Sequence, residues 1–391
     1  TVSEDKQELL TTLLGLSFVR RSSYPKDFVL HDEVRRLINQ YCWPVQDPAG
    51  RMRRELSDLA IQYYESVLGV EQNEQMRQSY IVEKLFHELF RDIEMGLKLF
   101  EEQFRKATTL WMRAFARSLL QEVQKFEKEM SAEQLCRVLM AEARLLRIEE
   151  NPVGALELYS RLECDTEWVA HHHLEILFEK GSCFQQMSQF PEAIGYFEAC
   201  LEAEELQAQP SLHAAILNDL GYIYKRQGEL AEAVRSYEAS LNAQRGVDNQ
   251  HEYAETLNSL GNIYRQQGKI EQALQLCKIA LRIRRELIQE GKISERYIAL
   301  SQSTIGLVYI DRAEIIRGGD DIARAESCFQ EAFEIYTRIG YKRGISVTYS
   351  RLGQVQMAKD HWEEALHLFK MAYETSLNID VETRMTSLNK R

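Results

Sequence analysis

The sequence contains few residues that interrupt helices and no segment that is apolar enough to cross a membrane. Its 391 residues include only 6 Pro and 19 Gly, while 45% are hydrophobic and 28% are charged. So few helix breakers exclude most β architectures, a collagen-like chain and a long disordered tail. No run of 18 uninterrupted apolar residues occurs, so we expect no contact with a membrane.

The chain also lacks the excess of positive charge that a nucleic-acid binder needs. Its formal net charge is −12. Residues 71–210 hold 15 Lys/Arg against 26 Asp/Glu, so this middle part of the chain carries nearly all of the acidity. Because nucleic-acid backbones are bound by basic faces, the charge argues against nucleic acid as a partner.

Signatures of catalysis and metal binding are missing as well. The seven Cys include no CxxC pair, which indicates buried free thiols in a reducing cytosol and hence a cytoplasmic protein. The sequence has no GxxxxGK[ST] phosphate loop, no GxSxG and no HExxH. Three consecutive His at 171–173 would point in three directions on a helix, so they cannot share one metal ion well. We therefore expect no catalytic residue, no metal, no cofactor and no enzymatic activity in this chain.

An internal repeat dominates the second half of the sequence. Two segments, LNDLGYIYKRQGELAEAVRSYEASL from Leu217 and LNSLGNIYRQQGKIEQALQLCKIAL from Leu257, align at an offset of 40 residues. Each has Leu-Gly, a Tyr three residues after the Gly, a second Gly after seven and an Ala after twelve. The matching positions are Leu220, Gly221, Tyr224, Gly228 and Ala233, then Leu260, Gly261, Tyr264, Gly268 and Ala273.

This pattern resembles the tetratricopeptide repeat (TPR) in a longer variant of about 40 residues. Gly221 and Ala233 would let two helices of one unit approach closely, and Gly228 would end the first helix with a positive φ. Weaker copies extend the pattern to six units. The equivalent first positions are 143, 181, 221, 261, 306 and 353, and the fifth unit has about seven extra residues centred on 317–321. We expect an all-α fold, in which a right-handed TPR superhelix, an α-α solenoid, spans residues 131–391.

In such a superhelix the first helix of each unit would line the concave groove. The resemblance assigns this role to residues three before, one after and four after the first glycine. An extended peptide suits this set, because Asn amides can bond its backbone and cations can bind its carboxylates. The alternative is that Asn218 and Asn258 only stabilise neighbouring helices. The candidate groove residues are Phe178, Ser182, Gln185, Asn218, Tyr222, Lys225, Asn258, Asn262, Arg265 and Ser303.

Two further segments precede the array. Residues 71–130 have apolar residues at spacings of three and four, which predicts a helical arm or linker. In residues 1–70, the segments LSFVRR and FVLHDEVRRLI flank the turn RSSYPKD. This order of helix, strand, turn, strand and helix indicates the C-terminal part of a small winged-helix domain.

The motif after the second strand, Leu30-His31-Asp32, is similar to that of the STAND class of signal-transducing NTPases, with the NB-ARC branch closest. In that family the histidine reaches the β-phosphate of bound ADP and locks a resting state, so His31 would be a nucleotide sensor and Asp32 would cap the next helix. The resemblance implies ADP or ATP with Mg in a longer protein, bound by a nucleotide-binding domain before residue 1. The plain alternative is a partly buried histidine beside an ordinary N-cap.

The resemblances together favour a ligand-sensing and autoinhibitory region of a STAND-type NTPase. The groove would bind a protein or peptide inducer, and binding would free the nucleotide domain and permit oligomerisation. One alternative is a stand-alone TPR scaffold that holds protein partners. The other is a winged-helix transcription regulator, whose basic residues would be offset by neighbouring acids. Those residues are Arg35, Arg36, Arg51, Arg53 and Arg54, against Asp32, Glu33, Asp47 and Glu55.

Overall fold

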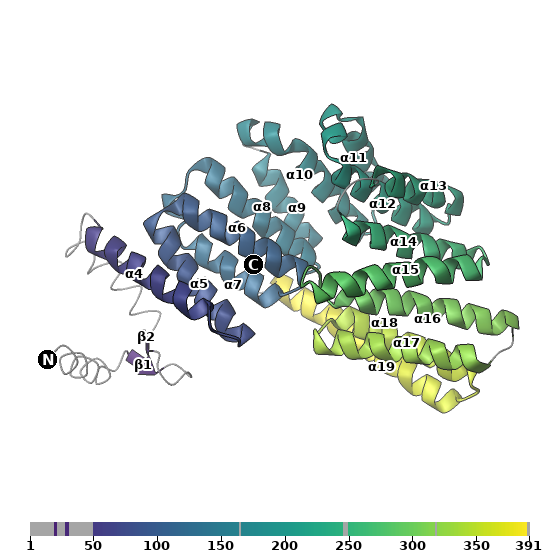
Figure 1. Ribbon diagram of the computed structural model, residues 1–391. Coiled ribbons are helices and arrows are strands. Elements are labelled where there is room, and N and C mark those ends of the chain that lie inside the picture. The colour runs from purple at the N-terminus through teal and green to yellow at the C-terminus, as the bar shows by residue number, and fades with distance from the viewer. Residues whose placement is uncertain are drawn as a thin grey trace. The chain divides into compact units, whose positions relative to one another are not determined.

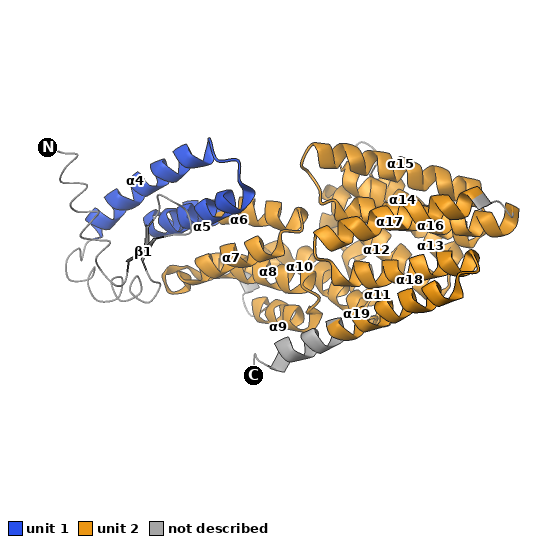
Figure 2. Ribbon diagram, turned by 90° about the horizontal axis from the view of Figure 1, so that it is seen from below, with its two compact units in different colours: residues 1–99 blue, residues 100–391 orange. Residues whose placement is uncertain are grey.

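The structure, a computed structural model, describes residues 19–21, 28–30, 50–163, 166–244, 249–316 and 319–388. The chain divides into two compact units, Thr1–Leu99 and Phe100–Arg391 (Figure 2). Nearly all of the described residues are helical, which agrees with the all-α class that the sequence indicates.

The first unit contains a short antiparallel pair of strands, β1 (Val19–Arg21) and β2 (Phe28–Leu30), with Val19 opposite Leu30. These strands occupy the two segments that the sequence analysis placed on either side of a wing. His31 and Asp32 of the predicted nucleotide-sensing motif lie outside the described residues, and of Leu30 only the strand position is described. The winged-helix domain therefore remains a prediction.

The rest of the first unit is helical. Helices α4 (Arg51–Leu68) and α5 (Glu74–Arg91) pack together, and α6 (Ile93–Thr109) begins before the unit ends. The Asn73 side chain accepts a hydrogen bond from the amide of Met76 and so caps the start of α5. Ile61, Leu85 and Leu89 form its buried apolar centre.

The second unit is a chain of helical hairpins (Figure 1). Proline occupies the first turn of three of its helices, where the missing amide proton has no intrahelical acceptor to bond and therefore costs nothing. Short 3₁₀ turns, η2 (Glu127–Glu129) and η3 (Glu204–Ala208), join some of the helices. After α6 the helices are α7 (Arg113–Gln124), α8 (Ala132–Ile148), α9 (Pro152–Leu162), α10 (Thr166–Gln186), α11 (Phe190–Glu202), α12 (Pro210–Gln227), α13 (Leu230–Ala243), α14 (Gln250–Gln266), α15 (Ile270–Gln289), α16 (Arg296–Ile316), α17 (Gly319–Arg338), α18 (Lys342–Ala358) and α19 (Trp362–Leu388).

In the units that have it, the first glycine makes room for a side chain of the second helix. A Cβ atom on Gly221 would lie 2.8 Å from the Tyr237 ring, and one on Gly306 would lie 2.6 Å from the Phe329 ring. The sequence analysis expected this glycine to admit a neighbouring backbone. Its contact is instead an aromatic side chain, except at Gly261, where the space is filled by the sulfur of Cys277 and by backbone.

The residue seven positions after the first glycine ends the first helix in the left-handed conformation. Gly228 and Gly268 have φ values of 85° and 77°, which confirms the prediction for these glycines. Equivalent residues in other units share the conformation although they carry side chains: Glu150 has φ 64°, Ser188 has φ 60° and Asp360 has φ 61°. The backbone turn is therefore common to these units, while glycine is present in only some of them.

Replacing Asp360 with glycine should stabilise the chain by about 0.5–1 kcal/mol, because a side chain in the left-handed region is strained. Asp360→Ala is the matched control, since it removes the same carboxylate but keeps a Cβ atom. We expect the glycine variant to have a higher urea midpoint than the unchanged chain. The alanine variant should show no such increase. Equal midpoints for the two variants would show that the turn carries no strain at this position.

The turn between α6 and α7 has the same backbone conformation, in a segment that the sequence analysis assigned to the linker. Trp111 lies seven residues after Phe104 and has φ 62°. Ala116, twelve residues after Phe104, is fully buried, as are Ala233 and Ala273 at the matching positions. This segment thus shares the turn conformation and the buried alanine of the repeat units.

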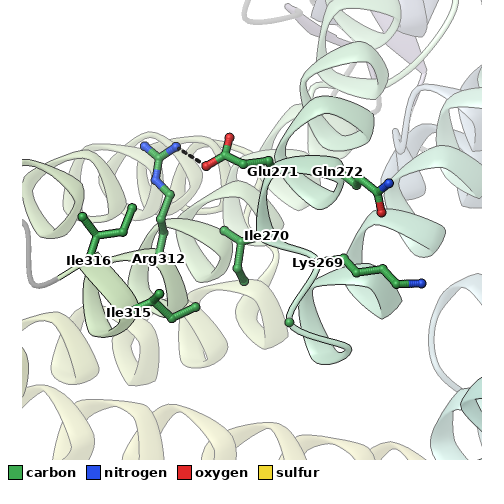
Figure 3. Close-up of a pocket in the computed structure, with 8 residues that line it drawn as sticks. Lys269, Ile270, Glu271, Gln272, Arg312, Ile315 and Ile316 are labelled. Atoms are coloured by element: carbon green, nitrogen blue, oxygen red, sulfur yellow. Dashed lines mark hydrogen bonds and ion pairs between the residues drawn. The ribbon is translucent and has the colours of Figure 1, made fainter.

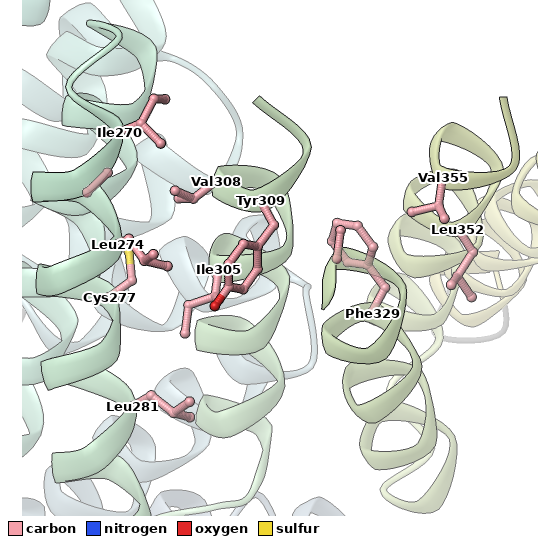
Figure 4. Close-up of a cluster of buried hydrophobic side chains, with 12 residues drawn as sticks. Ile270, Leu274, Cys277, Leu281, Ile305, Val308, Tyr309, Phe329, Leu352 and Val355 are labelled. Carbon is pink, nitrogen blue, oxygen red and sulfur yellow. The ribbon is translucent and has the colours of Figure 1, made fainter. Parts of the chain in front are cut away.

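Consecutive units are joined by apolar seams between the second helix of one unit and the first helix of the next. Ile270, Leu274 and Leu281 of α15 face Ile305 and its neighbours on α16 (Figure 4). The same cluster continues through α17 to α18, so one continuous core runs along these units. Such stacking is the source of stability in a repeat protein, where each unit contacts mainly its neighbours.

Candidate functional site

The first helices of successive units form one layer. Helix α10 packs against both α8 and α12, and α14 packs against both α12 and α16. The predicted groove residues lie on these helices, so side chains from units 40 residues apart in sequence become neighbours. This layer is the candidate functional site.

Contacts between distant parts of the second unit bring the two ends of the layer together. The guanidinium carbon of Arg296 lies 4.0 Å from the centroid of the Trp111 ring and 4.8 Å from that of Tyr341. The Trp111 and Tyr341 rings meet edge to face, with centroids 5.9 Å apart. Arg343 also forms an ion pair with Glu150 at 3.4 Å. The turns after α6 and α8 are therefore linked to the starts of α16 and α18.

Glu179 is the buried centre of an ion-pair network between α8 and α10. It accepts hydrogen bonds from Nε of Arg144 at 3.0 Å, from Nε of Arg147 at 2.8 Å and from the hydroxyl of Tyr159 at 3.3 Å. Arg144 also binds Glu175. Burial alone would raise the pKa of Glu179, but Arg147 and Arg144 outweigh it and lower the pKa. The carboxylate is thus held in its charged form.

Asp219 on α12 differs from Glu179 in that its surroundings raise the pKa of its carboxyl group. Its side chain accepts a hydrogen bond from Nε2 of Gln185 at 3.3 Å, a predicted groove residue on α10. Burial, together with the nearby charge of Glu255, raises the pKa of Asp219 to about 7, against the hydrogen bond from Gln185. Asp219 therefore changes its charge close to neutral pH.

The contribution of Asp219 to stability should fall as the pH rises from about 4 to 7, because the native state keeps a proton on Asp219 that the unfolded chain has already released. Asp219→Asn removes this dependence and should stabilise the chain at pH 8 by about 1–2 kcal/mol, with little effect at pH 4. Urea denaturation at both pH values measures this. Glu192→Gln, an exposed site on α11, serves as the control. A pH-independent effect of Asp219→Asn would contradict the assignment.

Arg265 on the first-helix layer lies close enough to two other cations, Lys225 and Arg351, for its charge to lower their pKa values. Lys225 on α12, Arg265 on α14 and Arg351 on α18 are all partly buried. Burial lowers the pKa of Lys225, and the charges of Arg265 and Arg226 lower it further. Burial and the charge of Arg265 likewise lower the pKa of Arg351. We refer to Lys225, Arg265 and Arg351 as the cation cluster.

The cation cluster carries more positive charge than its surroundings neutralise. Arg265 binds Asp311 of α16 at 2.6 Å and donates from Nε to Asn262 at 3.2 Å. Arg351 donates to the neutral Gln354 at 3.1 Å. Within the described part of the chain, Asp311 is the one carboxylate recorded as an ion-pair partner of the cluster. An anionic ligand group would therefore find unsatisfied donors here.

Two asparagines at equivalent positions have carbonyl oxygens with no partner. The side-chain oxygens of Asn218 and Asn258 are buried and accept no hydrogen bond. The other end of Asn258 donates to Thr304 of α16 at 3.2 Å. This contact supports the alternative that Asn258 links neighbouring helices, and the oxygen of the same side chain stays without a partner. Because buried polar atoms are nearly always bonded, the two oxygens mark acceptor sites for a ligand or water.

The remaining candidate groove residues differ in the solvent exposure of their side chains. Tyr222 is exposed. Ser182 is buried, and Ser303 is half-buried beside Tyr336. Phe178 packs against Phe197 in the core between α10 and α11, with ring centroids 6.0 Å apart. These contacts involve Phe178 and Ser182 in packing between helices, and a ligand role for either remains a prediction.

The sequence analysis missed Glu179, Asp219 and Arg351. None of these residues occupies the three positions that the repeat resemblance assigns to the groove. Glu179 and Asp219 both lie two residues before the first glycine of a unit, as does Arg351. A search for charged residues at this position of the repeat would have found all three.

In the histidine run, His172 is engaged in local contacts with Trp168. The His172 ring stacks on Trp168 with centroids 4.0 Å apart, and its Nδ1 lies 3.0 Å from the Trp168 carbonyl oxygen. Among the residues that the structure describes, no group of three or more His, Cys, Asp or Glu side chains could hold a metal ion. Within the same residues, no helix is both long and apolar enough to cross a membrane.

A separate pocket of about 410 Å³ lies between the start of α15 and the end of α16 (Figure 3). Its lining includes Ile315 and Ile316, which are 65% and 62% exposed. Arg312 at its edge is already paired with Glu271 at 3.2 Å and with Asp321 at 2.7 Å. The pocket contains none of the predicted groove residues and is less suited to a charged ligand than the cation cluster.

A family model described as tetratricopeptide repeat matches residues 212–286 and 304–377. A search of curated proteins gave no significant match. The family match and the hairpin geometry together define the class of fold: the chain contains an all-α solenoid of tetratricopeptide repeats.

Three solved structures are similar to this chain to different degrees, and the first of them supports the fold. A Rap protein complexed with competence and sporulation factor is 12% identical, with a TM-score of 0.50 over 90% of this chain and 99% of its own. The apo form of the quorum sensor NprR from B. thuringiensis is 16% identical, with a TM-score of 0.47 over 82% of this chain and 99% of its own. BtubC from P. vanneervenii is 20% identical, with a TM-score of 0.42 over 64% of this chain and 93% of its own.

Proposed function

We propose that this chain is a recognition region whose first-helix layer binds an extended, acidic segment of a protein or peptide. The observation that carries the proposal is the cation cluster. Lys225 and Arg351 are partly buried cations whose pKa values are lowered, and the ion pair of Arg265 with Asp311 supplies one carboxylate to the cluster. A carboxylate of the ligand would relieve this unfavourable charge and form charge-assisted hydrogen bonds.

The two unpaired asparagine oxygens supply the second part of the site. Asn218 and Asn258 occupy the same position in consecutive units, so their oxygens repeat along the layer. A backbone amide of an extended segment could donate to each of them. Carboxylate binding and backbone binding together favour a peptide over a small anion. The Rap protein of similar fold was solved in complex with competence and sporulation factor, which is compatible with ligand binding by this architecture.

Fluorescence polarisation with pools of labelled ten-residue peptides tests the proposal. We expect the 391-residue chain to bind pools rich in Asp and Glu at least ten times more tightly than pools rich in Lys and Arg. Lys225→Glu combined with Arg351→Glu should lose this preference, because two charge-assisted contacts become repulsive.

The matched control is Lys278→Glu, which reverses an exposed cation on α15 away from the first-helix layer. It should bind as the unchanged chain does. Equal binding by the chain and the double variant, with both shown to be folded by circular dichroism, would refute recognition through the cation cluster.

At a finer level, we infer that the recognition region belongs to a STAND-type NTPase. The support is the Leu30-His31-Asp32 motif after a strand pair, followed by helices and repeats in the order typical of that class. A nucleotide-binding domain of the same protein would then hold ADP or ATP with Mg, and His31 would sense the nucleotide. Inducer binding would release an autoinhibited state and permit oligomerisation.

The sequence encoded before Thr1 tests this inference directly. We expect a GxxxxGK[ST] loop there, and His31→Ala in the full protein should raise basal ATP turnover. An upstream sequence without a phosphate loop would overturn the NTPase assignment and leave a stand-alone scaffold. It would not affect the peptide-binding result.

A further inference from the structure

Helix α19 carries an uncovered apolar stripe along one face. Trp362, Leu366, Tyr373 and Leu377 are 59%, 71%, 68% and 49% exposed. Their spacings of four, seven and four residues place them on one side of the helix. We refer to these four residues as the α19 stripe. Large apolar side chains gathered in this way usually mark an interaction surface.

The α19 stripe continues the seams that join the units of the array. Trp362, Leu366 and Tyr373 match Ile270, Leu274 and Leu281 of α15 in repeat position. In α15 these residues are buried against Ile305, Val308 and Tyr309 of the following helix, α16. Successive helices of such hairpins run antiparallel, so the α19 stripe is built to receive an antiparallel apolar helix.

The spacing of the α19 stripe shows which helix fits. The order of the spacings (four, seven and four residues) is the same from either end of the stripe. An antiparallel second copy of α19 therefore places Trp362 opposite Leu377 and Leu366 opposite Tyr373, with the two-fold axis between Phe369 and Lys370. Each large aromatic residue then faces a leucine, as interdigitated packing requires.

The area is sufficient for a modest dimer. A fully covered aromatic side chain buries roughly 150–250 Å², so the exposed parts of the four side chains and their mates supply on the order of 900 Å². Stable specific interfaces start near roughly 1,200 Å², and the polar residues that flank the α19 stripe add to the apolar area. A dissociation constant in the micromolar range is the natural expectation.

We infer that α19 is a self-association surface through which two copies of this chain pair by antiparallel packing of their α19 stripes. The α19 helix of each copy then serves as the antiparallel apolar helix that covers the α19 stripe of the other copy. This inference does not depend on the proposed peptide binding, because the cation cluster lies on the first helices of the units.

Sedimentation of the 391-residue chain over a range of concentrations tests the inference. We expect a monomer–dimer equilibrium with a micromolar dissociation constant. Leu366→Glu combined with Tyr373→Glu should weaken it by at least tenfold. Both residues are largely exposed, so the variant should fold, which thermal melting checks. Val347→Glu, an exposed apolar site on α18, is the matched control and should dimerise normally.

Cross-linking distinguishes the direction of pairing. In the antiparallel arrangement, Glu363→Cys in one copy approaches Glu374→Cys in the other, and a short bismaleimide should join a mixture of the two variants but neither variant alone. The unchanged chain controls for its own cysteines. A chain that stays monomeric at high micromolar concentration, a dimer unaffected by the double glutamate variant, or cross-links between identical positions would each overturn the inference.

Discussion

Replacing Glu179 with alanine should destabilise the chain by about 3–5 kcal/mol, because it leaves Arg144 and Arg147 without their shared buried partner. The carboxylate is 5% exposed, so water cannot replace it. Glu179→Gln should cost less, since an amide oxygen still accepts one hydrogen bond. Urea denaturation at pH 7 measures the change in the free energy of unfolding.

The matched control for Glu179 is Glu157→Ala, which removes an exposed carboxylate from the adjacent helix α9. It should change stability by less than about 0.5 kcal/mol. The pKa of Glu179 is lowered from its ordinary value of 4.5, so its contribution is present above pH 4.5 and is lost as the pH falls below it. A Glu179→Ala effect that persisted unchanged at pH 3 would contradict this electrostatic explanation.

Replacing Gly306 with alanine should destabilise the chain by about 2–3 kcal/mol. The added Cβ atom would lie 2.6 Å from the ring of Phe329, which is fully buried in the core shared by α15 to α18. Combining Gly306→Ala with Phe329→Leu should recover part of the loss, because the smaller side chain makes room for the methyl group. Thermal and urea unfolding of the two single variants and the double variant measure the coupling.

Gly195 on α11 provides the control for Gly306. A Cβ atom there would meet nothing within 4 Å. Gly195→Ala should therefore stabilise the chain by about 1 kcal/mol through helix propensity alone. If both alanine variants changed stability in the same direction, the packing explanation for Gly306 would fail.

Much of the array could be predicted from the sequence because its determinants are local. Gly221, Gly228 and Ala233 recur at fixed offsets, and each has a steric role within one hairpin. The matching turn between α6 and α7 was not predicted because Phe104 and Trp111 occupy the positions where glycine marks several of the other units. There the fold depends on backbone geometry and on the buried Ala116, which a search for glycines does not find.

The electrostatics of the site could be predicted less well because they arise between units. Lys225 and Arg265 were identifiable from their shared repeat position. Arg351 was not, since it lies at a different position and joins them only through the arrangement of α12, α14 and α18 in space. Similarly, the burial of Asp219 depends on α10 and α14, whose positions no single repeat specifies.

The contacts of Trp111, Arg296 and Tyr341 determine whether the ends of the array can unfold independently of the rest. An open row of repeats behaves as a one-dimensional chain in which an end unit can unfold without disturbing the rest. Here the turn after α6 contacts the starts of α16 and α18, so the row of repeats closes on itself and neither end frays independently. Pulling or melting one end then strains every seam between units. A partner that breaks the contacts of Arg296 therefore loosens units far from the place where it binds.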